Sequence, residues 1–209
     1  MHTALVYVRS IIFLAAALVS LPVLANQNTL LILGDSLSAA YGVPSDTAWV
    51  QLLRERLDSK GLDSWTVVNA SISGETTDGG ARRLPGLIEE NDPSVVIIEL
   101  GGNDGLRGFP PQVIESNLAS MIEQVQDSGA RAVLVGMQIP PNYGQRYTEM
   151  FANIYPTLSD RYNTALVPFF LDGIYDQQGM MQDDGIHPSE QAQAKLLDNI
   201  WPVLKPVLH

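Results

Sequence analysis

The sequence predicts an α/β domain in which about five parallel strands form a sheet between two layers of helices, a three-layer α/β/α sandwich. The first observation is a regular alternation of short apolar runs, typical of strands buried on both faces, with longer amphipathic segments. The second is length, because the 209 residues suit one domain and contain no internal repeat or dividing linker. Right-handed crossovers between parallel strands place helices on both faces of such a sheet.

The expected strands are short and rich in apolar and β-branched residues. Residues 29–34 (TLLILG) end at a glycine, and residues 94–100 (SVVIIEL) contain the strongest β-branched run. Continuous apolar character predicts that these strands are covered on both faces. The expected strands are residues 29–34, 65–69, 94–100, 131–137 and 165–169.

The expected helices lie between and after the strands. Residues 49–60 carry apolar side chains at helical spacing and stop at Gly61, and the run 80–90 is stopped by the Asn-Asp-Pro sequence that follows it. A polar loop containing proline and glycine is expected at residues 138–145. The expected helices are residues 49–60, 80–90, 112–127, 147–163 and 189–204.

Residues 1–25 have the pattern of a secretory signal peptide. Arg9 is their only charged side chain, and an apolar run from residue 11 to 24 precedes Ala25, a small residue at the expected cleavage point. That run is shorter than the about 20 residues that a membrane-spanning helix needs, so cleavage is favoured over a retained anchor. Residues 26–209 are therefore expected to form a periplasmic or secreted domain without a stable membrane anchor.

The composition excludes several classes of function. With 23 acidic and 12 basic residues, the net charge of −11 opposes nucleic-acid binding. The chain has no cysteine, so disulfides, thiolate metal sites and cysteine nucleophiles are excluded. Neither of the glycine-rich nucleotide-binding patterns occurs, and His187 is the only histidine between residues 3 and 208. We therefore expect no cofactor and no metal.

Polar residues follow four of the predicted strands, in positions that should converge. Because the carboxyl ends of parallel strands meet at the same edge of a sheet, ligands of such folds bind there. This convergence predicts a catalytic site more strongly than any single motif does. The polar segments are residues 34–38, 69–76, 101–104 and 183–188.

The candidate catalytic residues are Ser36, His187 and Asp184. His187 is the only imidazole available as a general base, and Asp184, three residues earlier, can accept its Nδ1–H. Ser36 lies where a buried strand turns sharply, as an activated nucleophile does. Each residue also has a structural interpretation, as a helix cap or turn former, and Ser38 is a rival nucleophile.

An oxyanion hole can be assembled from three hydrogen-bond donors. They are the backbone N–H groups of Ser36 and Gly74 and the side-chain amide of Asn103. Glycine allows close approach of a backbone N–H, and a fixed carboxamide adds a second type of donor. The alternative for residues 101–103 is an ordinary turn or a phosphate-binding helix N-terminus.

Four blocks of the sequence resemble the signature of the SGNH, or GDSL-type, hydrolase family. One residue of the candidate site falls in each block, in the order of the family: Ser36, Gly74, Asn103 and His187. The resemblance covers nearly all of residues 26–209 and is closest to the bacterial multifunctional esterases of that family. The blocks are GDSLSAAYG (34–42), SGETT (73–77), GGND (101–104) and DGIHP (184–188).

The resemblance implies a flavodoxin-like domain, a triad of Ser36, His187 and Asp184, and an oxyanion hole of Ser36, Gly74 and Asn103. It implies a monomer that cleaves carboxylic esters and thioesters: acyl and aryl esters, lysophospholipids and acyl-CoA-like thioesters. In the family, the loop after the fourth strand helps to form a groove for the acyl chain. The alternative is that the apolar residues here cover the edge of the sheet. The candidate groove residues are Leu106, Phe109, Pro110, Ile139 and Tyr143.

Three other interpretations stay open at this point. A carbohydrate O-acetylesterase would use the same triad and strongly prefer acetyl esters. An acyltransferase would pass the acyl group to an alcohol in place of water. A non-catalytic flavodoxin-like binding module would keep the same residues as turn formers and would show neither turnover nor covalent labelling of Ser36.

Overall fold

The computed structural model describes residues 28–209, so the expected signal peptide lies outside the described residues. One sheet of five parallel strands has the order β2-β1-β3-β4-β5. With helices on both faces, this is the predicted three-layer α/β/α fold, which is confirmed. The strands are β1 (Asn28–Gly34), β2 (Trp65–Asn69), β3 (Val95–Glu99), β4 (Arg131–Val135) and β5 (Ala165–Val167).

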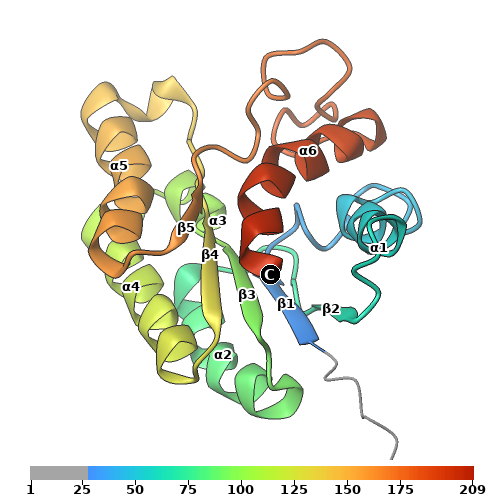
Figure 1. Ribbon diagram of the computed structural model, residues 1–209. Helices are drawn as coiled ribbons and strands as arrows, with labels where there is room; N and C mark the ends of the chain where they lie inside the picture. The colour runs from blue at the N-terminus through green and yellow to red at the C-terminus, as the bar shows by residue number, and fades with distance from the viewer. Residues whose placement is uncertain (1–27) are drawn as a thin grey trace, which may run out of the picture.

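The helices divide between the two faces of the sheet (Figure 1). On one face α1 (Trp49–Ser59) packs against α6 (Gln193–Leu204). On the other, α4 (Pro111–Asp127) lies between α2 (Thr77–Asn91) and α5 (Gln145–Tyr162). Within residues 28–209, no helix combines the length and apolar character needed to cross a bilayer. The short elements are α3 (Gly102–Leu106) and the 3₁₀ turns η1 (Pro141–Tyr143), η2 (Glu190–Ala192) and η3 (Lys205–Leu208).

The core lies on both sides of the two central strands, β1 and β3. Residues 30–33 of β1 and 95–98 of β3 have no solvent-exposed surface. In the parallel register Leu31 is paired with Val96 and Ile32 with Ile97, so the apolar runs lie beside one another. Burial of these runs between two helical layers supplies the main stabilising term of the fold.

Several expected boundaries differ from the observed ones. Helix α2 begins at Thr77, three residues before the expected start, because the Thr76 side chain accepts the N–H of Gly79 and caps it. The strands expected at 131–137 and 165–169 were too long, since β4 ends at Val135 and β5 ends before Pro168. Helix α3 was not expected, because five residues with two glycines carry no helical apolar period.

Gly136 closes the ladder between β4 and β5 where the two strands end. Its N–H donates to Val167 O at 2.7 Å, and its carbonyl accepts from Phe170 N at 2.9 Å. A Cβ atom at Gly136 would lie 2.3 Å from Pro168 O and 2.8 Å from Val167 O. These obstacles are main-chain atoms, which cannot rotate away.

We therefore expect Gly136→Ala to lower the free energy of unfolding by about 1–3 kcal/mol, as overpacking does. Urea denaturation followed by circular dichroism measures the change. The matched control is Gly86→Ala in the interior of α2, where nothing lies within 4 Å of the added methyl group. That variant should gain about 0.5–1 kcal/mol, and equal midpoints for the two variants would contradict the account.

Candidate active site

The turn after β1 holds Ser36 in a fixed position. The Asp35 side chain accepts the N–H of Leu37 at 3.0 Å, which is an Asx-type turn. Ser36 lies inside this turn and is 7% exposed. A Cβ atom at Gly34 would lie 2.7 Å from Oε2 of Glu99, so the chain enters the turn through a residue without a side chain. The sharp turn at the end of a buried strand therefore requires glycine and presents the serine at the rim.

The structure brings Ser36, His187 and Asp184 into one chain of hydrogen bonds. His187 Nε2 lies 3.0 Å from Ser36 Oγ, and its Nδ1 lies 2.6 Å from Asp184 Oδ2. The other carboxylate oxygen of Asp184 accepts the N–H groups of Ile186 at 2.9 Å and His187 at 3.0 Å. The loop between the two residues therefore orients the carboxylate toward the imidazole ring.

These contacts also favour the ionised form of Asp184 and fix the tautomer of the neutral His187 ring. The backbone hydrogen bond from His187, followed by its side-chain bond, lowers the pKa of Asp184 to about 2. An ionised carboxylate only accepts, so Nδ1 of His187 carries a hydrogen at neutral pH. In the neutral ring Nε2 is then the acceptor that faces the Ser36 hydroxyl. This is the state in which an imidazole can remove the proton of a serine.

The expected oxyanion donors are located at the same rim. Asn103 donates its Nδ2 to Asp35 Oδ2 at 2.9 Å, which fixes the orientation of the amide because a carboxylate only accepts. Gly74 has a φ of +79°, and its carbonyl accepts from Arg107 at 3.1 Å. Among the hydrogen bonds of residues 28–209, none is donated by the backbone N–H of Ser36 or Gly74. Both N–H groups are therefore available to a bound oxygen.

A buried glutamate, Glu99, lies beneath the turn that holds Ser36, and sequence analysis did not identify it. Glu99, at the end of β3, is fully buried, and its Oε2 accepts Asp35 N at 3.2 Å and Ser38 Oγ at 2.7 Å. Burial and then the charge of Asp35 raise the pKa of Glu99, while burial raises the pKa of Asp35 to about 6. Burial therefore opposes ionisation of both carboxyl groups, and that of Glu99 more strongly.

The rival nucleophile Ser38 has a different environment from Ser36. Its hydroxyl donates to Glu99, and its side chain is almost completely buried. Its carbonyl accepts from Asn69 Nδ2 at 2.8 Å, which ties the turn to the end of β2. These contacts indicate that Ser38 supports the turn.

The candidate groove residues are only partly gathered in one place. Tyr143 is exposed and donates its hydroxyl to Leu106 O at 2.9 Å. Phe109 is half-buried, Pro110 is exposed directly before α4, and Ile139 lies in the core, where it contacts Gly105. A cavity of about 510 Å³ adjoins Tyr143 at the start of α5. It is lined by Tyr143, Gly144, Gln145, Arg146, Tyr147 and Met150.

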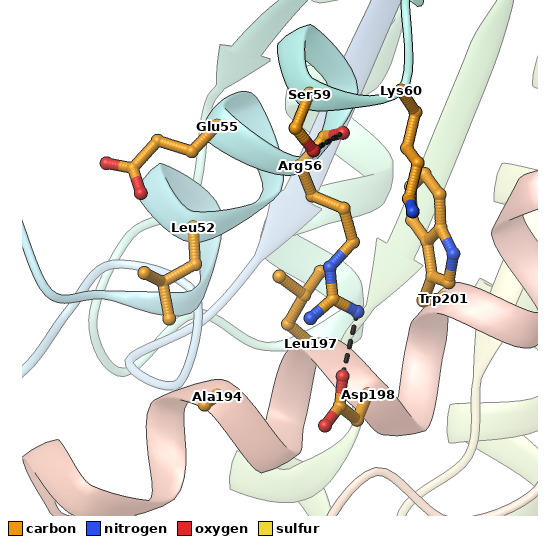
Figure 2. Close-up of a pocket in the computed structure, with 9 residues that line it drawn as sticks. All are labelled: Leu52, Glu55, Arg56, Ser59, Lys60, Ala194, Leu197, Asp198 and Trp201. Atoms are coloured by element: carbon orange, nitrogen blue, oxygen red, sulfur yellow. Dashed lines mark hydrogen bonds and ion pairs between the residues drawn. The ribbon is translucent and has the colours of Figure 1, made fainter.

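Another cavity, of about 660 Å³, lies between α1 and α6 (Figure 2). Arg56 extends into it, 2.8 Å from the carboxylate of Asp198 and with its guanidinium 5.6 Å from the centre of the Trp201 ring. The cavity contains none of the predicted site residues, so it is separate from the candidate active site. Within residues 28–209, no three acidic, histidine or cysteine side chains form a group suited to a metal ion.

The fold and the hydrogen-bond chain together define a class, the α/β/α proteins with a serine hydrolase-type site at the carboxyl edge of a parallel sheet. The GDSL-like lipase/acylhydrolase family matches residues 32–195 of the chain. The protein therefore belongs to that family, and the resemblance carried by the four sequence blocks is confirmed.

Similar proteins cover nearly the whole chain. Esterase TesA of Pseudomonas aeruginosa is 54% identical over 192 residues, which are 92% of this chain and 95% of that protein. Thioesterase 1/protease 1/lysophospholipase L1 of Escherichia coli K12 is 45% identical, over 88% of this chain and 87% of its own. An arylesterase of Vibrio mimicus is 51% identical, over 78% of this chain and 82% of its own. A crystal structure of TesA superposes with a TM-score of 0.84, covering 86% of this chain and 99% of that chain.

The buried position of Asp35 predicts how stability depends on pH. Its pKa is about 6 when folded and 3.8 as an ordinary carboxyl, so its stabilising contribution is complete below about pH 4 and is lost as pH rises through 6. Asp35→Asn cannot ionise. The free energy of unfolding of this variant minus that of wild type should therefore rise by about 1–3 kcal/mol from pH 4 to pH 7.

Urea denaturation at several pH values measures this difference. The matched control is Asp46→Asn, which removes an exposed carboxyl and should keep the wild-type pH dependence. If Asp35→Asn also kept the wild-type dependence, burial would not raise the pKa of Asp35 in the folded protein.

Proposed function

We propose that the protein hydrolyses carboxylic esters and thioesters through an acyl-enzyme formed on Ser36. Its relatives are named esterase, arylesterase and thioesterase/lysophospholipase, and the chain is a carboxylic ester hydrolase of the GDSL family. The observation that carries the mechanism is the hydrogen-bond chain from Ser36 through His187 to Asp184.

In the first half of the reaction, His187 Nε2 takes the hydroxyl proton while Ser36 Oγ bonds to the carbonyl carbon. Asp184 stays ionised and stabilises the imidazolium that forms. Collapse of the tetrahedral intermediate breaks the bond to the leaving oxygen or sulfur, and the imidazolium returns its proton to that atom. A water molecule, deprotonated by His187, then releases the acid and restores Ser36.

Charge develops on the carbonyl oxygen in both halves of the reaction. We assign its stabilisation to the N–H groups of Ser36 and Gly74 and to the second N–H of the Asn103 amide, which Asp35 holds in place. Loss of one such donor typically removes about 3–4 kcal/mol of transition-state stabilisation. Stabilisation of the oxyanion by Asn103 therefore requires the correct orientation of its amide as well as its presence.

The remaining features of the sequence fit an exported enzyme. We propose that residues 1–25 are removed as a signal peptide and that the enzyme acts as a periplasmic or secreted monomer. A net charge of −11 supports small-molecule or lipid esters, rather than nucleic acid, as its partners. Leu106 and Tyr143, which lie together beside the rim, are proposed to contact the acyl chain, with Phe109, Pro110 and Ile139 as their neighbours.

Labelling with a fluorophosphonate tests the nucleophile. Intact-mass measurement and peptide mapping should find one adduct per chain, on Ser36, and none in Ser36→Ala. His187→Ala should label about 10³-fold more slowly or worse, because the serine then has no base. The matched control is Ser38→Ala, which should still be labelled on Ser36.

Each other result has a defined meaning. An adduct on Ser38 would keep the enzyme class and move the nucleophile, whereas no adduct on folded protein would favour a non-catalytic binding module. A series of p-nitrophenyl esters separates the enzymes, because a carbohydrate O-acetylesterase would lose activity sharply beyond acetyl. Acyl-glycerol formed in the presence of glycerol would indicate an acyltransferase.

A further inference from the structure

The loop that follows the nucleophile delivers an aromatic ring to the catalytic histidine. Tyr41 lies between two residues with left-handed backbone, Ala40 at φ +59° and Gly42 at φ +70°. Left-handed geometry is unfavourable for a residue with a side chain such as Ala40, so it persists only where surrounding contacts impose it. The conformation of this loop is therefore specified by the tertiary structure around it.

Gln182 supplies those contacts from the segment that leads to His187. Its Nε2 donates to Tyr41 O at 2.9 Å and to Pro188 O at 3.0 Å, and its backbone N–H donates to His187 O at 2.8 Å. A Cβ atom at Gly42 would lie 2.4 Å from Gln182 Oε1, so only glycine leaves room for this amide. One side chain thus joins the loop of Tyr41 to the loop of His187.

The ring of Tyr41 contacts His187 and still faces solvent. The two ring centroids are 4.4 Å apart with an interplanar angle of 36°, and Tyr41 is 51% exposed. Among residues 28–209, no hydrogen bond of the Tyr41 hydroxyl group is found. The ring, rather than the hydroxyl, is therefore what the loop presents beside the imidazole.

We propose that Tyr41 is a specificity-determining residue. Its ring lines the side of the active site where the leaving group lies and favours esters with aromatic leaving groups. This inference rests on the proposed function, in which His187 Nε2 protonates the leaving oxygen. A leaving group that receives this proton must lie next to the imidazole, and the ring of Tyr41, a half-exposed residue, is next to the same imidazole. Aromatic rings attract one another at 4.5–7 Å in offset or edge-to-face geometry, beyond their shared apolar area.

Benzyl butyrate and ethyl butyrate form a suitable pair of substrates, because they share an acyl group and their leaving alcohols have similar acidity. We expect Tyr41→Ala to lower the ratio of kcat/KM for benzyl over ethyl ester by about two- to tenfold. Tyr41→Phe should retain the wild-type ratio, since the ring is kept. The control is Tyr175→Ala, which removes another exposed tyrosine that contacts an aromatic ring, that of Phe169.

The alternatives give different results. If Tyr41→Ala lowered kcat/KM equally for both esters and shifted the acid limb of the pH profile, Tyr41 would act by positioning His187. The specificity role would then be wrong. An unchanged ratio would also overturn the inference. Wild-type protein that hydrolysed neither ester and resisted labelling of Ser36 would instead reject the proposed function itself.

Discussion

The positions of Ser36 and of Asp35, which holds the Asn103 amide, depend on the contact between Glu99 and the turn after β1. One oxygen of this buried side chain accepts both the Asp35 N–H and the Ser38 hydroxyl, directly beside the site where Gly34 lacks a Cβ. Burying a carboxyl group is unfavourable unless hydrogen bonds compensate, and here the two bonds to Oε2, which link the ends of two central strands, do so for one oxygen, while Oε1 has no partner among residues 28–209. The nucleophile is therefore attached to the rigid core, the placement that precise catalytic geometry needs.

Two segments from distant parts of the sequence are aligned on this turn and on the loop that follows it. Asp35 holds the amide of Asn103, Ser36 meets His187, and the loop of Tyr41 is bound by Gln182. A displacement of the turn would consequently move the oxyanion donor, the nucleophile and the base at the same time. This shared attachment explains why a single glycine and two buried carboxyls lie under a site whose chemistry uses neither carboxyl as an acid or a base.

The fold, and the proximity of Ser36, His187 and Asp184, could be predicted because both leave local patterns in the sequence. Continuous apolar runs indicated the strands, and Asp184 and His187 are close enough in sequence for one turn to join them. Glu99 gave one weak signal, an acidic residue ending an apolar strand, and apolar patterning does not say which partners satisfy a buried carboxyl. The contact of Gln182 with Tyr41 joins residues 141 positions apart, so only the tertiary structure reveals it.

Chemistry and substrate preference are built into different parts of the molecule. In the proposed mechanism the triad and its oxyanion donors act on a carbonyl that esters and thioesters share, and Ser36 is held by the buried turn. Selectivity depends on the groups on either side of that carbonyl, which we propose are contacted by the exposed side chains of Tyr41 and Tyr143. Apolar contacts discriminate weakly between substrates. One methylene group changes kcat/KM by about 10–200-fold in an enclosed pocket and by less on an open surface. We therefore expect an enzyme of this construction to accept several acyl and leaving groups, with a preference that can change without disturbing the turn of Ser36.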